Sequence, residues 1–322
     1  MRLLICTQTV DHIDPILGFF HRWIVEFAAH YEQVSVICLE EGRHTLPSNV
    51  RVYSLGKEQG AVSRLQYALR FWRLLWQLRG QYDTVFVHMN PEYLILGGAW
   101  WRIAHKKVAL WYTHKSVNLR LRVAALFAHI IFTASKESFR LSSNKVHVVG
   151  HGIDTDFFSP DTSVLRTNTV LSVGRLSPTK RHDLVIRAAA LSGQTVRIIG
   201  DGPERGRLEQ LARQLGVAAR IQFLGGLTQE LLRYEYRSAQ VLVHTSETGS
   251  VDKVVLEALA CGLPVVSTST SLGDVPVVVV DATPEEIAKA LVVPHTVDAS
   301  YVRTRHSLAA LVSQLVSLLA AQ

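Results

Sequence analysis

The stretch "TVRIIGDGPERGRLEQLARQLGVAARIQFLG" (195–225) has the pattern of a strand, a helix and a second strand. Its first and last segments, 195–200 and 221–225, are short runs rich in β-branched and other apolar residues. Residues 204–215 between them have the length and the apolar spacing of a helix. Strands that are separated by a helix-length segment favour a crossover connection and therefore a parallel sheet.

The same alternation extends in both directions along the chain. In the second half we predict strands at 170–174, 241–246, 264–269 and 276–282, and helices at 181–192, at 228–238 and around Glu257. In the first half we predict a helix at 17–29 and strands at 2–8, 34–40, 50–55, 84–89, 108–114, 130–135 and 145–152. A polar, turn-rich segment at 154–169 separates the halves. We therefore predict two doubly wound α/β domains, 1–158 and 159–303, followed by an apolar helix at 304–322 that packs back on the first domain.

Length and composition agree with this organisation. The 322 residues exceed what one core usually supports, and 48% hydrophobic against 19% charged residues indicate a folded protein. We see no export signal and no run of about 18 apolar residues, so we expect a cytoplasmic protein. Cys6, Cys38 and Cys261 lie far apart in apolar segments, which favours reduced core residues.

Positive charge gathers in the first half. The net charge is +7, and residues 1–160 hold 18 Lys and Arg against 12 Asp and Glu. No acidic residue occurs in 93–136, and every tryptophan of the chain lies before residue 112. We expect this half to meet an acidic or amphiphilic partner, although we find no nucleic-acid-binding motif.

One segment of the first half has the composition of a membrane-surface helix. "SRLQYALRFWRLLWQLRGQY" (63–82) places apolar and aromatic residues at helical spacing, with four arginines among them. The apolar set is Leu65, Ala68, Phe71, Trp72, Leu75, Trp76 and Leu78. Such a stripe either packs on its own sheet or lies in the interface of an anionic membrane. We favour peripheral attachment to the inner face of the cell membrane.

A basic loop follows the first strand of the second domain. "SVGRLSPTK" (172–180) offers Gly174 for a tight turn, and Arg175 and Lys180 as cations at the strand end. Two fixed cations suit a diphosphate and stabilise a departing phosphate. The alternative is a solvated basic loop. The chain has neither a Walker loop nor G-x-G-x-x-G, which disfavours triphosphate hydrolysis and dinucleotide binding.

A single acid lies within the apolar stretch "SETGSVDKVVLEALACGLPVVST" (246–268). Glu257 is either at a solvated helix edge or paired with a ligand, because an unpaired buried carboxylate is costly. Ser250 is a plausible N-cap, which leaves the first N–H groups of the helix facing an anion. We expect Glu257 to accept the two hydroxyls of a ribose whose phosphates lie near the helix start.

Several motifs together resemble the retaining, nucleotide-sugar-dependent glycosyltransferases of family 4. In the second half they are "VGRLSPTKR", "IIGDGPERGRLEQLARQLG", "IQFLGGL", "VLVHTSE" and "KVVLEALACGLPVVST", and in the first half "HGIDTDFF" and "WYTH". The resemblance covers nearly the whole chain. It implies the GT-B fold, in which two facing Rossmann-like domains enclose a cleft. The first domain would bind the acceptor and the second the nucleotide sugar.

The resemblance also implies roles for individual residues. His114, Arg175 and Lys180 would be catalytic, with Arg175 and Lys180 on the donor diphosphate and His114 near the donor sugar. The remaining donor-binding positions would be Gly174, Leu224, Gly225, Gly249, Ser250, Val251 and Glu257, where Leu224 and Gly225 hold the base through backbone groups. Gly18, His88 and Asn90 would belong to the acceptor side or its loop.

Two departures from the family pattern are visible. The glutamate that the family usually has eight residues before the ribose glutamate is Gly249 here. Glu247 and Asp252 are candidate substitutes, although neither matches its register. The glycine pair of the first strand–helix loop is reduced to Gly18. Gly249 keeps open one rival, a non-catalytic lectin-like or partner subunit that binds the nucleotide sugar. A second rival, from the same fold, is an epimerase acting on UDP-N-acetylglucosamine.

The predicted reaction is sugar transfer from a UDP- or GDP-linked donor with retention of the anomeric centre. The acceptor is a glycan or a lipid-linked sugar in cell-surface polysaccharide or glycolipid synthesis. We expect no cofactor. We also expect metal independence, because we see no D-x-D metal motif and because a site rich in cations works by positioning and charge stabilisation.

Overall fold

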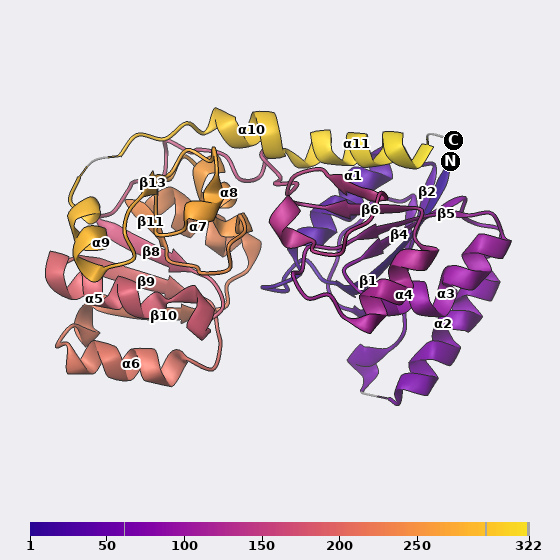
Figure 1. Ribbon diagram of the computed structural model, residues 1–322, viewed down its shortest axis with the longest axis horizontal. Helices are drawn as coiled ribbons and strands as arrows, with labels where there is room; N and C mark the ends of the chain where they lie inside the picture. Colours follow the sequence, from indigo (N-terminus) through magenta and orange to yellow (C-terminus); the bar gives the residue numbers. More distant parts are fainter. Residues whose placement is uncertain (61, 294, 321–322) are drawn as a thin grey trace. The chain divides into compact units, whose positions relative to one another are not determined.

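The computed structural model describes residues 1–60, 62–293 and 295–320, and its chain divides into two compact units (Figure 1). The first unit is formed by Met1–Gly152 together with the last helix, and the second by Ile153–Ser307. The sequence places the boundary slightly later, at 158/159. Each unit holds one parallel sheet, which confirms the predicted pair of Rossmann-like α/β domains of the GT-B fold.

The first unit is built on a seven-stranded sheet in which every pair of neighbours is parallel. Its strands, in spatial order, are β3 (Val50–Ser54), β2 (Gln33–Glu41), β1 (Arg2–Val10), β4 (Thr84–His88), β5 (Lys107–Trp111), β6 (Ile130–Thr133) and β7 (Val146–Val148). Its helices are α1 (Phe19–His30), α2 (Arg64–Leu78), α3 (Pro91–Ile103), α4 (Leu119–Phe127) and α11 (Leu308–Ala320). The order reverses between β1 and β4, where ligands of such sheets bind.

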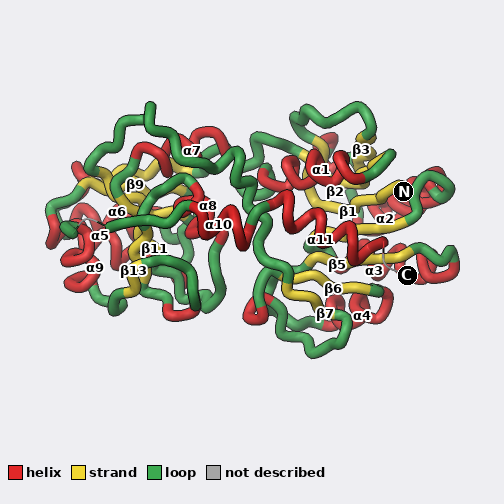
Figure 2. Tube along the Cα trace, turned by 90° about the horizontal axis from the view of Figure 1, so that it is seen from above, coloured by secondary structure: helices red, strands yellow, loops and turns green. Residues whose placement is uncertain are grey.

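Helices cover both faces of this sheet with separate hydrophobic layers. α1 and α11 pack on one face, where Trp23, Phe27 and Leu315 are buried. α2, α3 and α4 pack on the other, around Phe71 and Trp101. Figure 2 shows α11 lying over the strands of this sheet, as its buried residues at helical spacing require.

The predicted single helix at 304–322 is wrong, because the chain forms two helices there. α10 (Ser300–His306) ends before Ser307, whose ψ of 143° is extended, and α11 begins at Leu308. α10 packs against α8 in the second unit, whereas α11 packs against α1 in the first. Residues 321–322 lie outside the described part of the chain.

The second unit repeats the architecture with six parallel strands. In spatial order they are β10 (Ile221–Gly225), β9 (Thr195–Ile199), β8 (Thr169–Val173), β11 (Val241–His244), β12 (Val265–Ser267) and β13 (Val278–Val279). Its remaining helices are α5 (His182–Ser192), α6 (Arg205–Gln214), α7 (Gln229–Ser238), α8 (Lys253–Ala260) and α9 (Pro284–Leu291). The order reverses between β8 and β11, so the loops after these strands lie at the switch point.

The stripe of α2 divides between core and surface. A capping box at Ser63 starts the helix, and Phe71, Leu75 and Leu78 pack into the first core. The other apolar residues face outward: Leu65, Leu69, Trp72 and Trp76 are exposed, with Arg64, Arg70, Arg73 and Arg79 around them. Part of the stripe thus stabilises the sheet, and part forms an apolar and basic surface, here called the α2 surface.

Candidate functional site

The carboxyl ends of β8 and β9 meet in a tight backbone arrangement. Gly174 has a φ of 152°, and its N–H donates to the carbonyl of Ile199 at 2.9 Å. A Cβ on Gly200 would lie 2.1 Å from the carbonyl oxygen of Gly174, and one on Gly202 would lie 2.3 Å from that of Leu176. Only glycine fits at 200 and 202, because the loop after β8 lies directly against this backbone.

The loop after β8 is also tied to the loop after β11. The N–H of Glu247 donates to the carbonyl of Thr179 at 2.9 Å, and the hydroxyl of Thr245 donates to the carbonyl of Lys180 at 2.8 Å. The Arg181 guanidinium pairs with the Glu247 carboxylate at 2.5 Å. These bonds bring together two of the loops that carry predicted donor-binding residues.

Lys180 is held by an acid that the sequence analysis did not assign. Its Nζ donates to Asp252 Oδ2 at 2.5 Å and to Ser246 Oγ at 3.3 Å. His244 Nε2 lies 2.8 Å from the same Oδ2, and its Nδ1 lies 3.0 Å from Ser267 Oγ. Lys180 and Asp252 are 72 positions apart in the chain, so no sequence spacing reveals their contact.

His244 and Lys180 together set the charge state of Asp252. Burial works to raise the pKa of Asp252, but the hydrogen bond from His244 and the charge of Lys180 outweigh it. The pKa of Asp252 therefore lies well below its usual value, and the carboxylate stays ionised beside the ammonium.

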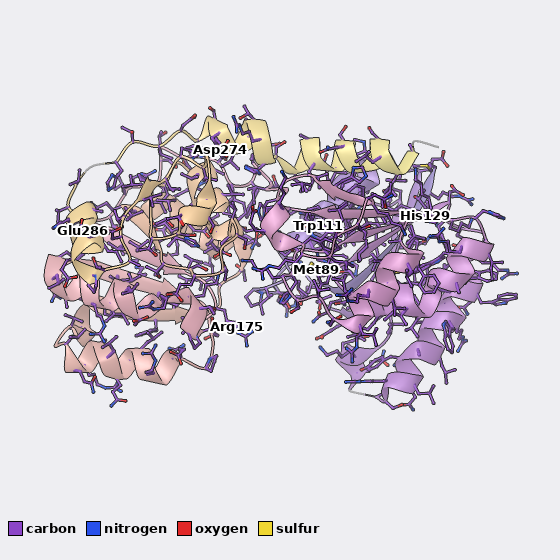
Figure 3. All side chains as sticks on the ribbon, viewed as in Figure 1. Met89, Trp111, His129, Arg175, Asp274 and Glu286 are labelled. Carbon is purple, nitrogen blue, oxygen red and sulfur yellow. The ribbon has the colours of Figure 1, made fainter. Side chains whose placement is uncertain are left out.

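Arg175 contrasts with Lys180. It is exposed at the end of β8 (Figure 3), and no hydrogen bond or ion pair of its side chain occurs within the described residues. An arginine without a protein partner at a strand end can meet an anion with its full set of N–H donors.

The loop before α8 differs from the prediction. The N-cap is Asp252 and not Ser250, because the helix begins at Lys253. The Asp252 side chain does not cap the helix, since it is directed at Lys180 and His244. Gly249, where the family pattern has glutamate, has a φ of 62°, which disfavours any side chain there.

Glu257 is buried and has protein partners. Its Oε2 accepts a hydrogen bond from the Tyr236 hydroxyl of α7 at 3.1 Å, and Lys253 lies one turn earlier on α8. Burial raises the pKa of Glu257, and the charge of Lys253 opposes that shift. Burial lowers the pKa of Lys253. The solvated helix edge is therefore wrong for this acid, because its side chain is bonded to Tyr236 of α7 and only 5% of the residue is exposed.

The turn after β10 lies beside these loops. Gly225 has a φ of 71°, and its carbonyl accepts from the N–H of Gly200 at 2.8 Å. Asp201 Oδ2 accepts from the N–H of Gly226 at 2.7 Å. The turn that contains Leu224 and Gly225 is thus fixed to the backbone at 200–201.

In the first unit, the other predicted site residues follow strand ends or flank the first loop. His88 ends β4 in the core, where it stacks on Phe20 with ring centroids 3.8 Å apart, and its Nδ1 lies 3.2 Å from Thr7 Oγ1. Asn90 is the N-cap residue of α3. His114 is exposed in the loop after β5, which ends at Trp111 and not at the predicted residue 114.

Gly18 is required by the loop between β1 and α1. A Cβ there would lie 2.5 Å from the carbonyl oxygen of Asp14 and 2.9 Å from that of His12. The single glycine therefore lets the loop fold against the start of α1.

The predicted absence of a D-x-D motif is wrong. Asp154, Thr155 and Asp156 have the D-x-D spacing of some metal sites. Asp154 Oδ1 accepts the N–H groups of Asp156 and Phe157, and Asp156 pairs with Arg303. In the described residues, no group of three or more His, Cys, Asp or Glu has the arrangement of a metal site.

The sequence of the second unit is similar to that of known proteins. Residues 154–303 match the family model of the glycosyl transferases group 1. A D-inositol 3-phosphate glycosyltransferase of Mycobacteroides abscessus is 38% identical over 153 residues, 42% of this chain and 34% of that protein. The one of Mycolicibacterium smegmatis is 36% identical over 170 residues, 48% of this chain and 38% of that protein. The matched segment thus spans little more than a third of these curated relatives.

Solved structures resemble the whole chain. A complex of Anabaena HepE with UDP and glucose has a TM-score of 0.77 at 19% identity and covers 100% of both chains. WaaG, a glycosyltransferase involved in lipopolysaccharide biosynthesis, has a TM-score of 0.70 at 15% identity, covering 99% of this chain and 100% of its own. At these identities the similarity shows the fold. The second unit therefore matches the glycosyl transferases group 1, and the chain as a whole has the GT-B fold.

Proposed function

We propose that this protein transfers a sugar from a nucleoside diphosphate donor to a glycan or lipid-linked acceptor, with retention and without a metal. The observation that carries the proposal is the pair of cations at the end of β8, with Lys180 held and Arg175 unpartnered within the described residues. The family match of residues 154–303 and the UDP complexes of HepE support a nucleotide-sugar donor.

Within this proposal, the second unit binds the donor. Arg175 and Lys180 contact the diphosphate and stabilise the charge that develops on the leaving group. Glu257 accepts from the ribose, with Tyr236 holding its other side. The base is held by backbone groups of Leu224 and Gly225. The loop of Gly249, Ser250 and Val251 lines the phosphates beside Gly174.

The first unit supplies the acceptor side. His114, exposed after β5, contacts the donor sugar near the reacting carbon. His88, Asn90 and Gly18 shape the loops after β1 and β4, with Gly18 at the loop that meets the acceptor. The leaving phosphate takes the acceptor proton, so the site needs cations more than a carboxylate pair.

Proton NMR of the first product formed from a nucleotide sugar tests the reaction. Retention predicts that the axial or equatorial configuration of the donor persists in the product, and EDTA leaves the rate unchanged. Inversion, or loss of turnover in EDTA that a divalent metal restores, would overturn the proposed mechanism.

We further propose that the protein binds an anionic membrane surface through the α2 surface. None of the helices in the described part of the chain has both the length and the apolar character that a membrane span requires. The α2 surface exposes Trp72, Trp76, Leu65 and Leu69 among arginines, as interfacial helices do. Each basic residue near an anionic surface contributes about 1 kcal/mol.

Co-sedimentation with vesicles tests this surface. Wild type should bind vesicles that contain phosphatidylglycerol and stay in solution with pure phosphatidylcholine. Leu69→Ser with Trp76→Ser should lose binding, whereas Leu191→Ser with Leu231→Ser, which changes exposed residues of the second unit, should not. Equal recovery of both variants with the vesicles would contradict the assignment.

Gly249 favours one rival function, a non-catalytic subunit that binds the nucleotide sugar. Its left-handed φ of 62° would strain the backbone if the family's acid stood there. Saturable donor binding with no transfer and no donor hydrolysis would support that rival. Turnover of UDP-N-acetylglucosamine without an acceptor would instead support the epimerase.

A further inference from the structure

We infer that Asp252 is a positioning residue for Lys180: its carboxylate, steadied by His244, directs the ammonium toward a diphosphate. The inference rests on the proposed function and deepens it, because it gives a role to an acid that lies outside the family's glutamate register. The observation is the shared oxygen Oδ2, which lies 2.5 Å from Lys180 Nζ and 2.8 Å from His244 Nε2.

The count of hydrogen-bond donors gives the ammonium a direction. An ammonium has three N–H groups. Within the described residues, Lys180 directs them at Asp252 Oδ2 and at Ser246 Oγ, which leaves one N–H without a protein acceptor. Because the first two are fixed, the direction of the third is fixed too. A phosphate oxygen is the acceptor that suits a charged donor at a strand end.

The surrounding residues hold the carboxylate in place. His244 is 4% exposed, and its Nδ1 lies 3.0 Å from Oγ of the fully buried Ser267. The N–H of Ser269 donates to that same Oγ at 3.1 Å. These hydrogen bonds link β12 through His244 to Asp252 and hold the Asp252 carboxylate in one position.

The charge of Asp252 has a second effect on a bound diphosphate. The carboxylate offsets the charge of Lys180, so it weakens the electrostatic attraction between Lys180 and an anion. It also orients the free N–H of Lys180 toward the diphosphate. Removing the charge should therefore tighten ground-state binding and slow transfer. A residue that only stabilises the fold would weaken both.

Asp252→Asn separates these two readings. UDP and inorganic pyrophosphate are titrated by calorimetry, and kcat is measured on the nucleotide sugar that the wild type turns over. We expect both ligands to bind about three- to tenfold more tightly and kcat to fall about tenfold or more. Weaker binding of both ligands, or an unchanged kcat, overturns the inference.

A matched control tests for simple loss of an ion pair. Glu235 on α7 pairs with Arg197 on β9 at 2.9 Å, and both side chains are about as buried as those of Lys180 and Asp252. Glu235→Gln should lower the melting temperature and leave ligand affinity and kcat as in the wild type. Equal effects of Glu235→Gln and Asp252→Asn on kcat and affinity would overturn the positioning role.

A double-mutant cycle keeps the inference testable if Asp252→Asn folds poorly. Ser246→Ala removes the other acceptor of the ammonium and should lower kcat a few-fold, but less than twofold when Lys180 is already Met. Additive losses in that background contradict an action through Lys180. If the wild type binds neither UDP, GDP nor pyrophosphate, the proposed function itself fails. If the wild type binds these ligands but the variants have the same affinity and kcat as the wild type, only the positioning role of Asp252 is refuted.

Discussion

Lys180→Met is the substitution whose consequences the structure specifies most closely. Methionine keeps an unbranched stem and removes the charge and all three N–H groups. Losing a preorganised donor to a leaving phosphate costs about 2–4 kcal/mol in the transition state. We therefore expect kcat/KM to fall about 30- to 900-fold.

The same variant should also lose stability in a way that depends on pH. It leaves the Asp252 carboxylate, 19% exposed, with His244 as its remaining partner. Leaving such a charge half-satisfied costs about 1–3 kcal/mol. The pKa of Asp252 lies well below its ordinary value of 3.8 in the folded protein. The pair therefore stabilises fully above pH 3.8, and this stabilisation is lost as the pH falls from there through the lower folded-state pKa.

Steady-state kinetics at pH 7 measure the first effect, and urea unfolding followed by circular dichroism at pH 7 and pH 2.5 measures the second. The stability difference between wild type and variant should be larger at pH 7. A kcat/KM within threefold of wild type, or a stability difference that grows toward pH 2.5, would refute the reasoning.

Four further predictions follow from single residues of the second unit. Arg175→Ala should lower kcat/KM by a similar 30- to 900-fold but leave the melting temperature within a degree or two, because the side chain is exposed and has no hydrogen bond or ion pair within the described residues. A large loss of stability would argue against a role confined to ligand binding. Glu257→Ala should raise the donor KM at least tenfold with a smaller change in kcat, and Tyr236→Phe should do so more weakly, as donor titrations can show; equal KM in all three proteins would remove Glu257 from the site. His182 is buried beside Ser172, and burial lowers its pKa from 6.5 to about 4, so the folded protein loses up to about 3 kcal/mol of stability as the pH falls from 6.5 toward 4. His182→Gln should flatten that part of the stability profile in urea titrations, and an unchanged slope would contradict the lowered pKa of His182. Gly200→Ala should cost several kcal/mol of stability because its Cβ would lie 2.1 Å from the Gly174 carbonyl oxygen, and a melting temperature equal to that of wild type would show that the two loops separate easily.

Periodicity was enough to predict the parallel sheets. Buried strands such as β4 and β11 have continuous apolar runs, and the helix-length segments between most strands favour parallel pairing. The break at Ser307 could not be predicted in the same way, because the apolar spacing of the last segment continues without proline or glycine. The helix α9 was also missed, although Thr283 and Pro284 are an N-cap and first-turn pair.

The candidate site was predictable only where one loop carries it. The cations Arg175 and Lys180 lie five residues apart in the loop after β8, so the local sequence is enough to propose them. The contact of Lys180 with Asp252, and that of Glu257 with Tyr236, join distant segments through the fold. The sequence predicts Ser250 as the N-cap because serine suits that position, but Asp252 is the N-cap and its side chain contacts Lys180.

The central claim is that the loops after β8 and β11 bind a nucleoside diphosphate. Calorimetric titration of UDP and GDP into wild type, Arg175→Ala and Lys180→Met tests it without any knowledge of the acceptor. We predict saturable binding of one nucleotide per chain to the wild type, weakened at least tenfold in Arg175→Ala and in Lys180→Met. No binding of either nucleotide to the wild type, or equal affinity in all three proteins, would contradict the claim.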